Sequence, residues 1–311
     1  MPVVHELFGR TLTAGDRQGE ILNATCPHMG ALCNGGGNRD MARWPAGEQP
    51  LAPFFDAAVA KAGDIPCGVC SVRTNRVWAI CPHRLLTFIG QPSDEQQTLF
   101  ERVLDLGGFV SGDVVSVWSE VALSSRSEGV NYRLDYVLRC GQRPPVVVEI
   151  MTASTSGGNR RERTDIRNAF CDAVLFGVGQ IPEQRQSPGV NVRQVWARMA
   201  SQLVVKSQIV NHWGGRTIWV VQDALTDYIA NNTGVRLPEL ERADWTLDEV
   251  NVLAGSLDDP DDLTLYAGPV FPSRNGDACW AHLLDTPSLP EFDVIRAKLR
   301  PDAAVAEFTV P

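Results

Sequence analysis

The sequence predicts an α/β fold with a central mixed or antiparallel sheet flanked by helices. Runs of β-branched or alternating apolar residues, each bounded by turn residues, predict strands at 113–121, 131–140 and 145–152. A similar run predicts a fourth strand at 216–223, and helical patterns lie before and between these runs. A chain of 311 residues that is 44% hydrophobic is long enough to bury a sizeable core, as one large domain or two ordinary ones.

Three stretches predict the helices that flank this sheet. Residues 93–107 begin with Ser93 as a helix N-cap and end at Gly107, and both residue types are typical of helix ends. Residues 159–177 predict a helix that is charged in its first half and apolar in its second. Residues 191–211 predict a longer helix, because apolar positions recur on roughly one face.

Composition divides the chain into three segments. The first 85 residues are rich in loop-forming Gly, Pro and Asn, so we expect something other than a large core to order them. We therefore predict a small loop-rich module over residues 1–90 and the α/β core over residues 91–235. An acidic C-terminal extension over residues 236–311 is expected to pack on the core.

The net charge of −9, taken alone, argues against a nucleic-acid partner. The charge is, however, unevenly distributed along the chain. Residues 126–206 hold twelve Lys and Arg against seven Asp and Glu. Residues 237–311 hold five Lys and Arg against fifteen Asp and Glu. The middle of the chain is therefore compatible with phosphate binding, and the acidic end is interpreted as a solvated surface.

The sequence also bears on the compartment. No apolar run approaches the roughly 18 residues that a membrane-spanning helix requires, and the first residues lack the basic start and apolar stretch of a signal peptide. We therefore expect a cytoplasmic protein with no membrane partner. In that reducing compartment, cysteines bind metals more often than they form disulfides.

Five of the eight cysteines fall within one short N-terminal segment: Cys26, Cys33, Cys67, Cys70 and Cys81. Thiolates at such short spacings are typical of a structural site that holds zinc or iron through four sulfurs. His28 and His83 each follow a Cys-Pro pair and are alternative ligands. The competing interpretation is a set of buried free thiols.

Three carboxylates lie on the predicted strands. Glu149 ends the β-branched run "PPVVVEIMTAS", Asp135 lies within "YRLDYVL" and Glu120 ends "VWSEV". Neighbouring strands place such residues about 5 Å apart if the register permits, so we expect the three to converge at one edge of the sheet. Grouped carboxylates suit Mg²⁺. Their spacing is similar to the signature of the PD-(D/E)xK nucleases, in which an acid precedes an acid-x-Lys motif.

Taken together, the cysteine and carboxylate motifs resemble the NotI and EagI family of restriction endonucleases. The resemblance covers roughly residues 5–225. It is carried in order by "TCPHMGALC", "GVCSV", "VWAICPHRLL", Glu120, "RLDYVL", "VVEIMT" and "QLVVKSQIVNHWG".

The resemblance implies a PD-(D/E)xK core and a type II restriction endonuclease. It implies Mg²⁺-dependent double-strand cuts in DNA at a GC-rich palindrome, with 5′-phosphate ends. It also implies a homodimer and a cognate DNA methyltransferase in the same restriction-modification system. The metal-binding module is expected to lie away from the chemistry and to shape a DNA-binding surface.

The resemblance also assigns roles to individual residues. The family's iron ligands match Cys26, Cys33, Cys70 and Cys81, whereas Cys67 has no counterpart. The residues themselves do not separate iron from zinc. The catalytic carboxylates match Glu120, Asp135 and Glu149, of which Asp135 and Glu149 are expected to bind Mg²⁺.

One position departs from the pattern. Two residues beyond Glu149, where most such nucleases have lysine and NotI has glutamine, this chain has Met151. A thioether neither orients water nor neutralises charge on phosphate. Either Gln202 or Lys206, one helical turn apart on the predicted helix, supplies the polar group, or the protein is a catalytically impaired DNA-binding protein of the same fold. An electron carrier with an iron–thiolate centre is a third, less compatible class.

Two groups of arginines are candidate DNA contacts. One heads the predicted helix after the third carboxylate: Arg160, Arg161, Arg163 and Arg167. The other accompanies the cysteine motifs: Arg39, Arg73, Arg76 and Arg84. Guanidinium groups bind phosphates and guanine edges. For the first group, a solvated helix face is the alternative.

Overall fold

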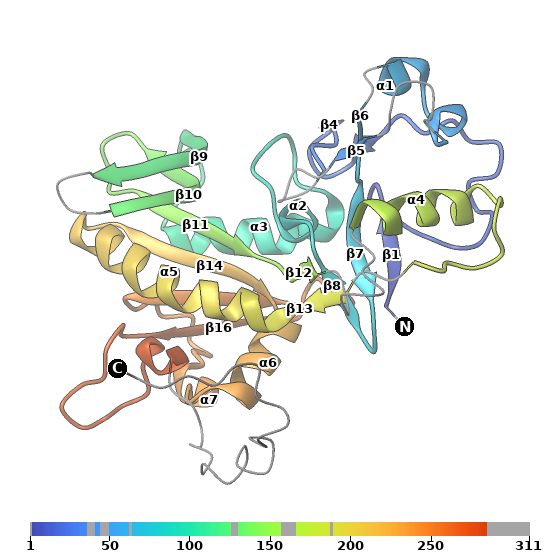
Figure 1. Cartoon of the computed structure of the whole chain (residues 1–311). Coiled ribbons are helices and arrows are strands. Elements are labelled where there is room, and N and C mark those ends of the chain that lie inside the picture. The colour runs from blue at the N-terminus through green and yellow to red at the C-terminus, as the bar shows by residue number, and fades with distance from the viewer. Residues whose placement is uncertain are drawn as a thin grey trace, which may run out of the picture.

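The computed structural model describes residues 2–35, 41–43, 50–61, 64–125, 130–156, 166–186 and 189–284. Its centre is a six-stranded sheet in the order β16-β15-β14-β11-β10-β9 (Figure 1). The strands are β9 (Val115–Ser125), β10 (Val130–Cys140), β11 (Val146–Met151), β14 (Arg216–Gln222), β15 (Val250–Gly255) and β16 (Leu263–Gly268). The two pairings of β14 are parallel and the other three are antiparallel, which confirms the predicted mixed sheet.

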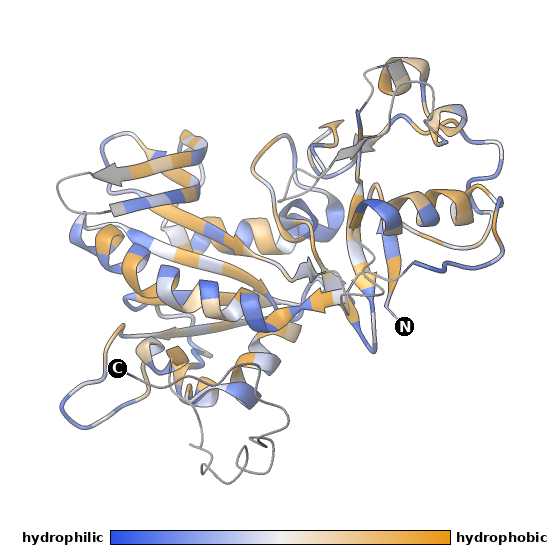
Figure 2. Cartoon of the chain, viewed as in Figure 1, coloured by the Kyte–Doolittle hydropathy of each residue, from blue (hydrophilic) through white to orange (hydrophobic). Residues whose placement is uncertain are grey.

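Helices cover both faces of this sheet (Figure 1). On one face, α3 (Asp94–Gly107) buries Leu99 and Val103 against β11, β14 and β15. On the other face, α5 (Val192–His212) buries Met199 and Leu203 against the alternate residues of β14 and β15. Because both faces are covered, the central strands are apolar almost throughout, as Figure 2 shows.

The predicted helices are confirmed where the structure describes them. Ser93 is the N-cap of α3, and its N–H donates to the Gln96 side chain at 3.4 Å. Gly108, just past the helix, has the left-handed conformation that ends it (φ 76°). Asn191 caps α5 by accepting a hydrogen bond from the Gln194 N–H. The third predicted helix is α4 (Ile166–Gly177), and its charged first half lies outside the described residues.

The N-terminal region contains a second sheet, of order β2-β1-β7-β8. Its strands are β1 (Val3–Leu7), β2 (Arg10–Thr11), β7 (Val69–Arg73) and β8 (Val77–Ala79). Short elements complete the region: β3 (Thr25–Cys26), β4 (Ala31–Leu32), β5 (Met41–Arg43), η1 (Ala52–Phe54), α1 (Ala57–Lys61), β6 (Asp64–Pro66) and α2 (Pro82–Leu85).

The expectation that something other than a large core orders this region is wrong. The rings of Phe8, Phe55 and Phe170 pack with centroids 6.0–6.3 Å apart, inside a larger group of buried apolar residues. Phe170 belongs to α4, which follows the central strands in sequence but lies beside β1 (Figure 1). A helix from a distant part of the chain therefore completes the N-terminal core.

The sheet extends past the predicted end of the core at residue 235. Both β15 and β16 belong to the segment that the sequence analysis set apart as a C-terminal extension. The remaining elements are β12 (Ser154–Ser156), β13 (Gly189–Asn191), α6 (Asp223–Asn232), α7 (Leu237–Leu240) and η2 (Trp280–Leu284). Residues 285–311 lie outside the described part of the chain. No helix within the described ranges is both long enough and apolar enough to cross a membrane.

A buried ion pair joins the N-terminal sheet to α2. The Nε of Arg84 donates to both carboxylate oxygens of Glu6, at 3.0 and 2.9 Å, and the two side chains are 8% and 9% exposed. Burial opposes ionisation of Glu6, but the Arg84 guanidinium outweighs it and holds the Glu6 pKa below its usual range. A second carboxylate, Glu95, lies 2.9 Å from an Arg84 terminal nitrogen.

We predict that Arg84→Ala destabilises the fold by about 3–5 kcal/mol, because it leaves the Glu6 carboxylate buried without its partner. The free energy of unfolding from urea denaturation is the measurement. Arg73→Ala is the matched control, since Arg73 is exposed and its guanidinium lies 3.0 Å from His5 Nε2. Equal stability of the two variants would show that the pair contributes little.

Candidate functional site

The three predicted carboxylates meet in one pocket of about 500 Å³. Tyr136 on β10 pairs with Val148 on β11, so the preceding residue, Asp135, lies opposite Glu149. The register of β9 against β10 likewise puts Glu120 opposite Asp135. All three line the pocket, so the expected convergence is confirmed. They lie where β10 stops pairing with β11, which leaves room for the pocket between the strands.

Glu149 and Asp135 are poorly solvated. Glu149 is 2% exposed, and burial together with the nearby Asp135 carboxylate raises its pKa to about 8. Burial likewise raises the pKa of Asp135, against the hydrogen bond that its Oδ2 accepts from the Ile150 N–H at 2.9 Å. The second carboxylate oxygen of Glu149, Oε1, is buried with no hydrogen-bond partner in the described structure. Two neighbouring acids in this pocket are therefore held with little solvent to stabilise their charge.

Lys206 is the one cation in direct contact with Glu149 in the described structure. Its Nζ lies 2.5 Å from Glu149 Oε2, and both side chains are 3% exposed. Lys206 comes from α5 on one face of the sheet and Glu149 from β11, so the contact also fixes the helix against the strand. The pair confirms that a polar group from α5 reaches the site.

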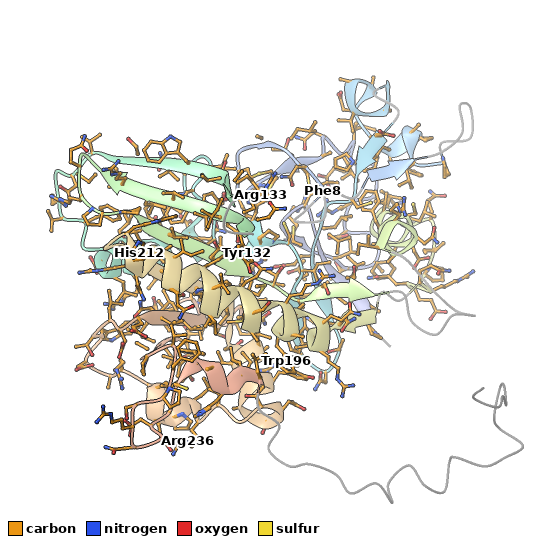
Figure 3. All side chains as sticks on the ribbon, turned by 60° about the vertical axis from the view of Figure 1, so that its left-hand side comes forward. Phe8, Tyr132, Arg133, Trp196, His212 and Arg236 are labelled. Atoms are coloured by element: carbon orange, nitrogen blue, oxygen red, sulfur yellow. The ribbon has the colours of Figure 1, made fainter. Side chains whose placement is uncertain are left out.

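Met151 itself contributes an apolar wall. Its side chain lines the pocket and packs against the buried residues between α5 and the sheet. Gln202, one turn before Lys206, also lines the pocket, together with an adjoining hollow that Lys206, Asp135 and Arg133 share. Figure 3 shows α5 running between the labelled Trp196 and His212, with the labelled Arg133 on β10.

Glu120 differs from the other two carboxylates. Its side chain is 48% exposed and pairs with Arg133 at 3.1 Å. Its backbone has a φ of +54°, a left-handed conformation that is unfavourable for a residue with a side chain. Such strain, of order 1–3 kcal/mol, is concentrated at functional sites, and here it falls on a residue of the carboxylate pocket.

The five N-terminal cysteines line a second, smaller pocket, but the predicted four-cysteine cluster is not seen. Among the described residues, no group of three or more Cys, His, Asp or Glu side chains is arranged to hold a metal ion. Cys67 lines the same pocket as the four predicted ligands, Cys26, Cys33, Cys70 and Cys81. A metal at these cysteines therefore stays a prediction.

Backbone N–H groups are directed at four of these sulfurs, and Gly35 N–H donates to Cys33 Sγ at 3.4 Å. Gly9 N–H donates to Cys70 Sγ at 3.2 Å. The backbone N–H groups of His28 and Met29 lie against Cys26, and those of His83 and Arg84 lie against Cys81. They oppose the rise in thiol pKa that burial causes. Hydrogen bonds of this kind favour the thiolate, which is the form that binds metal.

The two pockets are neighbours. Asn34 and His83 line both of them, and Asn34 Nδ2 lies 3.4 Å from His83 Nε2. The Nδ1 of His83 is buried and has no hydrogen-bond partner in the described structure. The expectation that the cysteine module lies away from the carboxylates is therefore wrong, since two residues form a wall common to both.

The arginine predictions have mixed outcomes. Arg84 is buried and paired with two carboxylates, so its geometry argues against a DNA contact. Arg76 pairs with Asp227 at 2.7 Å but remains 38% exposed, and Arg73 and Arg167 are exposed. The others lie outside the described residues: Arg39, Arg160, Arg161 and Arg163.

Sequence reasoning missed one charged residue of the pocket, Arg198. Arg198 lies four residues before Gln202 and eight before Lys206, and residues at these spacings share a helix face. This spacing could have placed Arg198 in the pocket from the sequence.

No protein-family model matches the chain, and no curated protein is significantly similar to it in sequence. The chemistry of the two pockets therefore carries the functional proposal.

We predict that Lys206→Met destabilises the metal-free protein by about 1 kcal/mol more at pH 9 than at pH 5.5, because loss of the ammonium raises the Glu149 pKa further and one pKa unit corresponds to about 1.4 kcal/mol. A carboxyl with a raised pKa binds more protons folded than unfolded, so stability falls as pH rises from the usual value of 4.5 towards about 8. The loss at pH 5.5, where Glu149 is protonated, should be clearly smaller.

Urea denaturation in EDTA at the two pH values measures this difference. The double variant Glu149→Gln/Lys206→Met is the control and should lose the pH dependence. An equal loss at both pH values in Lys206→Met would contradict the assignment of a charged Glu149–Lys206 pair.

Proposed function

We propose that this protein is a type II restriction endonuclease of the PD-(D/E)xK kind, which cuts double-stranded DNA with Mg²⁺. The observation that carries the proposal is the meeting of three carboxylates from neighbouring strands with a buried lysine, Lys206, on Glu149. Most such nucleases have a lysine where this chain has Met151, and here α5 supplies the lysine instead. The resemblance to the NotI and EagI family supports the same function.

The carboxylate pocket fits a divalent cation. The unpartnered Glu149 Oε1 and the raised pKa values of Asp135 and Glu149 describe two acids that need a counter-charge. Mg²⁺ typically takes one or two carboxylates and completes its shell with water and phosphate oxygens. Two protein carboxylates therefore suffice, and a third ligand from the chain is not required.

Each residue of the pocket has a distinct task. Asp135 and Glu149 would hold Mg²⁺, which when bound activates water and neutralises charge on the phosphodiester. Lys206 holds Glu149 in place and adds a positive charge near the attacked phosphate, and Gln202 offers a hydrogen bond to water beside it. Glu120 assists from the exposed side, and Met151 excludes bulk water. In-line attack would leave 5′-phosphate and 3′-hydroxyl ends.

The cysteine pocket is proposed to hold a structural metal, iron by the resemblance, with zinc as the alternative. The donors fit, because the thiols line one small buried pocket and backbone N–H groups lie against Cys26, Cys70 and Cys81. The ligands would be these three with Cys33. Such a metal would fix the short segment that carries His83 to the edge of the carboxylate pocket.

The remaining features of the proposal concern partners. A palindromic, GC-rich target implies a two-fold homodimer in which each subunit cuts one strand. A cognate methyltransferase would protect the cell's own copies of that site. Arg73, Arg76 and Arg167 remain candidate DNA contacts, together with the arginines outside the described residues.

A catalytically impaired DNA-binding protein is the second candidate. Met151 favours it, because the usual lysine or glutamine is missing from β11. Incubation with plasmid DNA and Mg²⁺ separates the two: discrete fragments support the endonuclease, and retarded but uncut DNA supports the binding protein.

We predict that Asp135→Ala lowers the rate of Mg²⁺-dependent DNA cleavage by more than about a hundredfold, the loss that even an outer partner of a catalytic metal can cause. The same variant should lose the rise in melting temperature that Mg²⁺ gives the wild type. Glu101→Ala, an exposed carboxylate on α3, is the matched control. Intact cleavage in Asp135→Ala would contradict the proposed mechanism.

We predict that the purified protein contains about one equivalent of iron or zinc, as four thiolates bind one ion. Elemental analysis should show that Cys70→Ser loses the metal, whereas Cys67→Ser and the distant, buried Cys279→Ser keep it. A wild-type protein without either metal, after growth with both supplied, would contradict the proposed site.

A further inference from the structure

The pocket-facing side of α5 carries a charged residue that the proposed mechanism does not use. Val195, Arg198 and Gln202 all line the carboxylate pocket, and Lys206 follows on the same side of the helix. Their spacings of three and four residues place them one above the other along one face. Arg198 lies about 12 Å along the helix axis from Lys206, since eight residues rise by 1.5 Å each.

The charge balance of the pocket singles out Arg198. Of the described residues that line the pocket, Arg198 is the one Lys or Arg. The other cations nearby are engaged, because Lys206 contacts Glu149 and Arg133 contacts Glu120. Arg198 is exposed and forms no ion pair with any described residue.

Such an arrangement is suited to a phosphate. Three carboxylates repel DNA, so a strand that enters the pocket needs a positive charge that the protein has not already neutralised. The guanidinium group matches phosphate oxygens with two parallel hydrogen bonds, and an exposed arginine can make them without losing an existing partner.

We propose that Arg198 binds a backbone phosphate of the strand to be cut, next to the phosphate that the carboxylates face. Its place on the helix, about two turns from Lys206, keeps it from the reacting centre but within the same pocket. Arg198 thereby positions the strand along α5, and Lys206 and Gln202 lie further along the same path. The inference rests on the proposed endonuclease function.

The test compares Arg198→Ala and Arg198→Lys with Arg193→Ala. Arg193 is an exposed arginine of the same helix that does not line the pocket, which makes it a matched control. The wild type first digests plasmid DNA with Mg²⁺, and the sequenced ends give the cut site. A duplex that contains this site then serves as the probe, for cleavage with Mg²⁺ and for binding with Ca²⁺ at several salt concentrations.

Arg198→Ala is expected to lower kcat/KM by about ten- to hundredfold, the range for one hydrogen bond to a charged group. The slope of log affinity against log salt concentration should fall by about one, because one phosphate contact is lost. Arg198→Lys should recover most of the slope, and Arg193→Ala should match the wild type. A purely structural role for Arg198 would change the melting temperature without changing the salt slope.

The outcomes separate the two proposals. If the wild type cuts DNA and Arg198→Ala keeps its salt slope and its kcat/KM, Arg198 does not bind phosphate and the endonuclease function stands. If the wild type neither cuts nor binds DNA, both proposals fall. If the wild type binds without cutting, the plasmid DNA itself is the probe, and the salt slopes on that DNA support or overturn the role of Arg198.

Discussion

The contact between Lys206 and Glu149 is the interaction on which the carboxylate pocket depends. It places a buried ammonium and a buried carboxylate in contact where α5 packs on β11. Desolvation of both groups opposes the pair, so the gain in stability over two apolar side chains is small or absent. Its effect is geometric. The carboxylate cannot rotate away, one oxygen faces the lysine, and the other stays without a partner in the described structure.

The surrounding structure keeps this costly arrangement intact. Apolar residues of α3 and α5 cover the two faces of β11 and β14, so the strand that carries Glu149 has little freedom. The pairing of β10 with β11 ends beside the acids, and the backbone of Glu120 is held in a left-handed conformation. The pocket thus forms where the sheet departs from regularity, and the packed centre compensates for the strain.

Local patterns in the sequence predicted the central elements well. The N-cap at Ser93, and the β-branched runs around Asp135 and Glu149, depend on residues close in sequence. The failures share a different cause. The N-terminal core needs Phe170 from a helix far along the chain. The burial of Arg84 likewise depends on Glu6, and the choice of Lys206 over Gln202 as the partner of Glu149 depends on how α5 is rotated against the sheet, which no spacing reveals.

The segment from Cys81 to Arg84 belongs to three environments at once. Cys81 lines the cysteine pocket, His83 forms the wall shared with the carboxylate pocket, and Arg84 makes the buried pair with Glu6. This single turn of helix therefore connects the N-terminal region to the carboxylate pocket. The N-terminal region is for this reason unsuited to exchange as an independent cassette: a graft of another module would remove one side of the carboxylate pocket along with the cysteines.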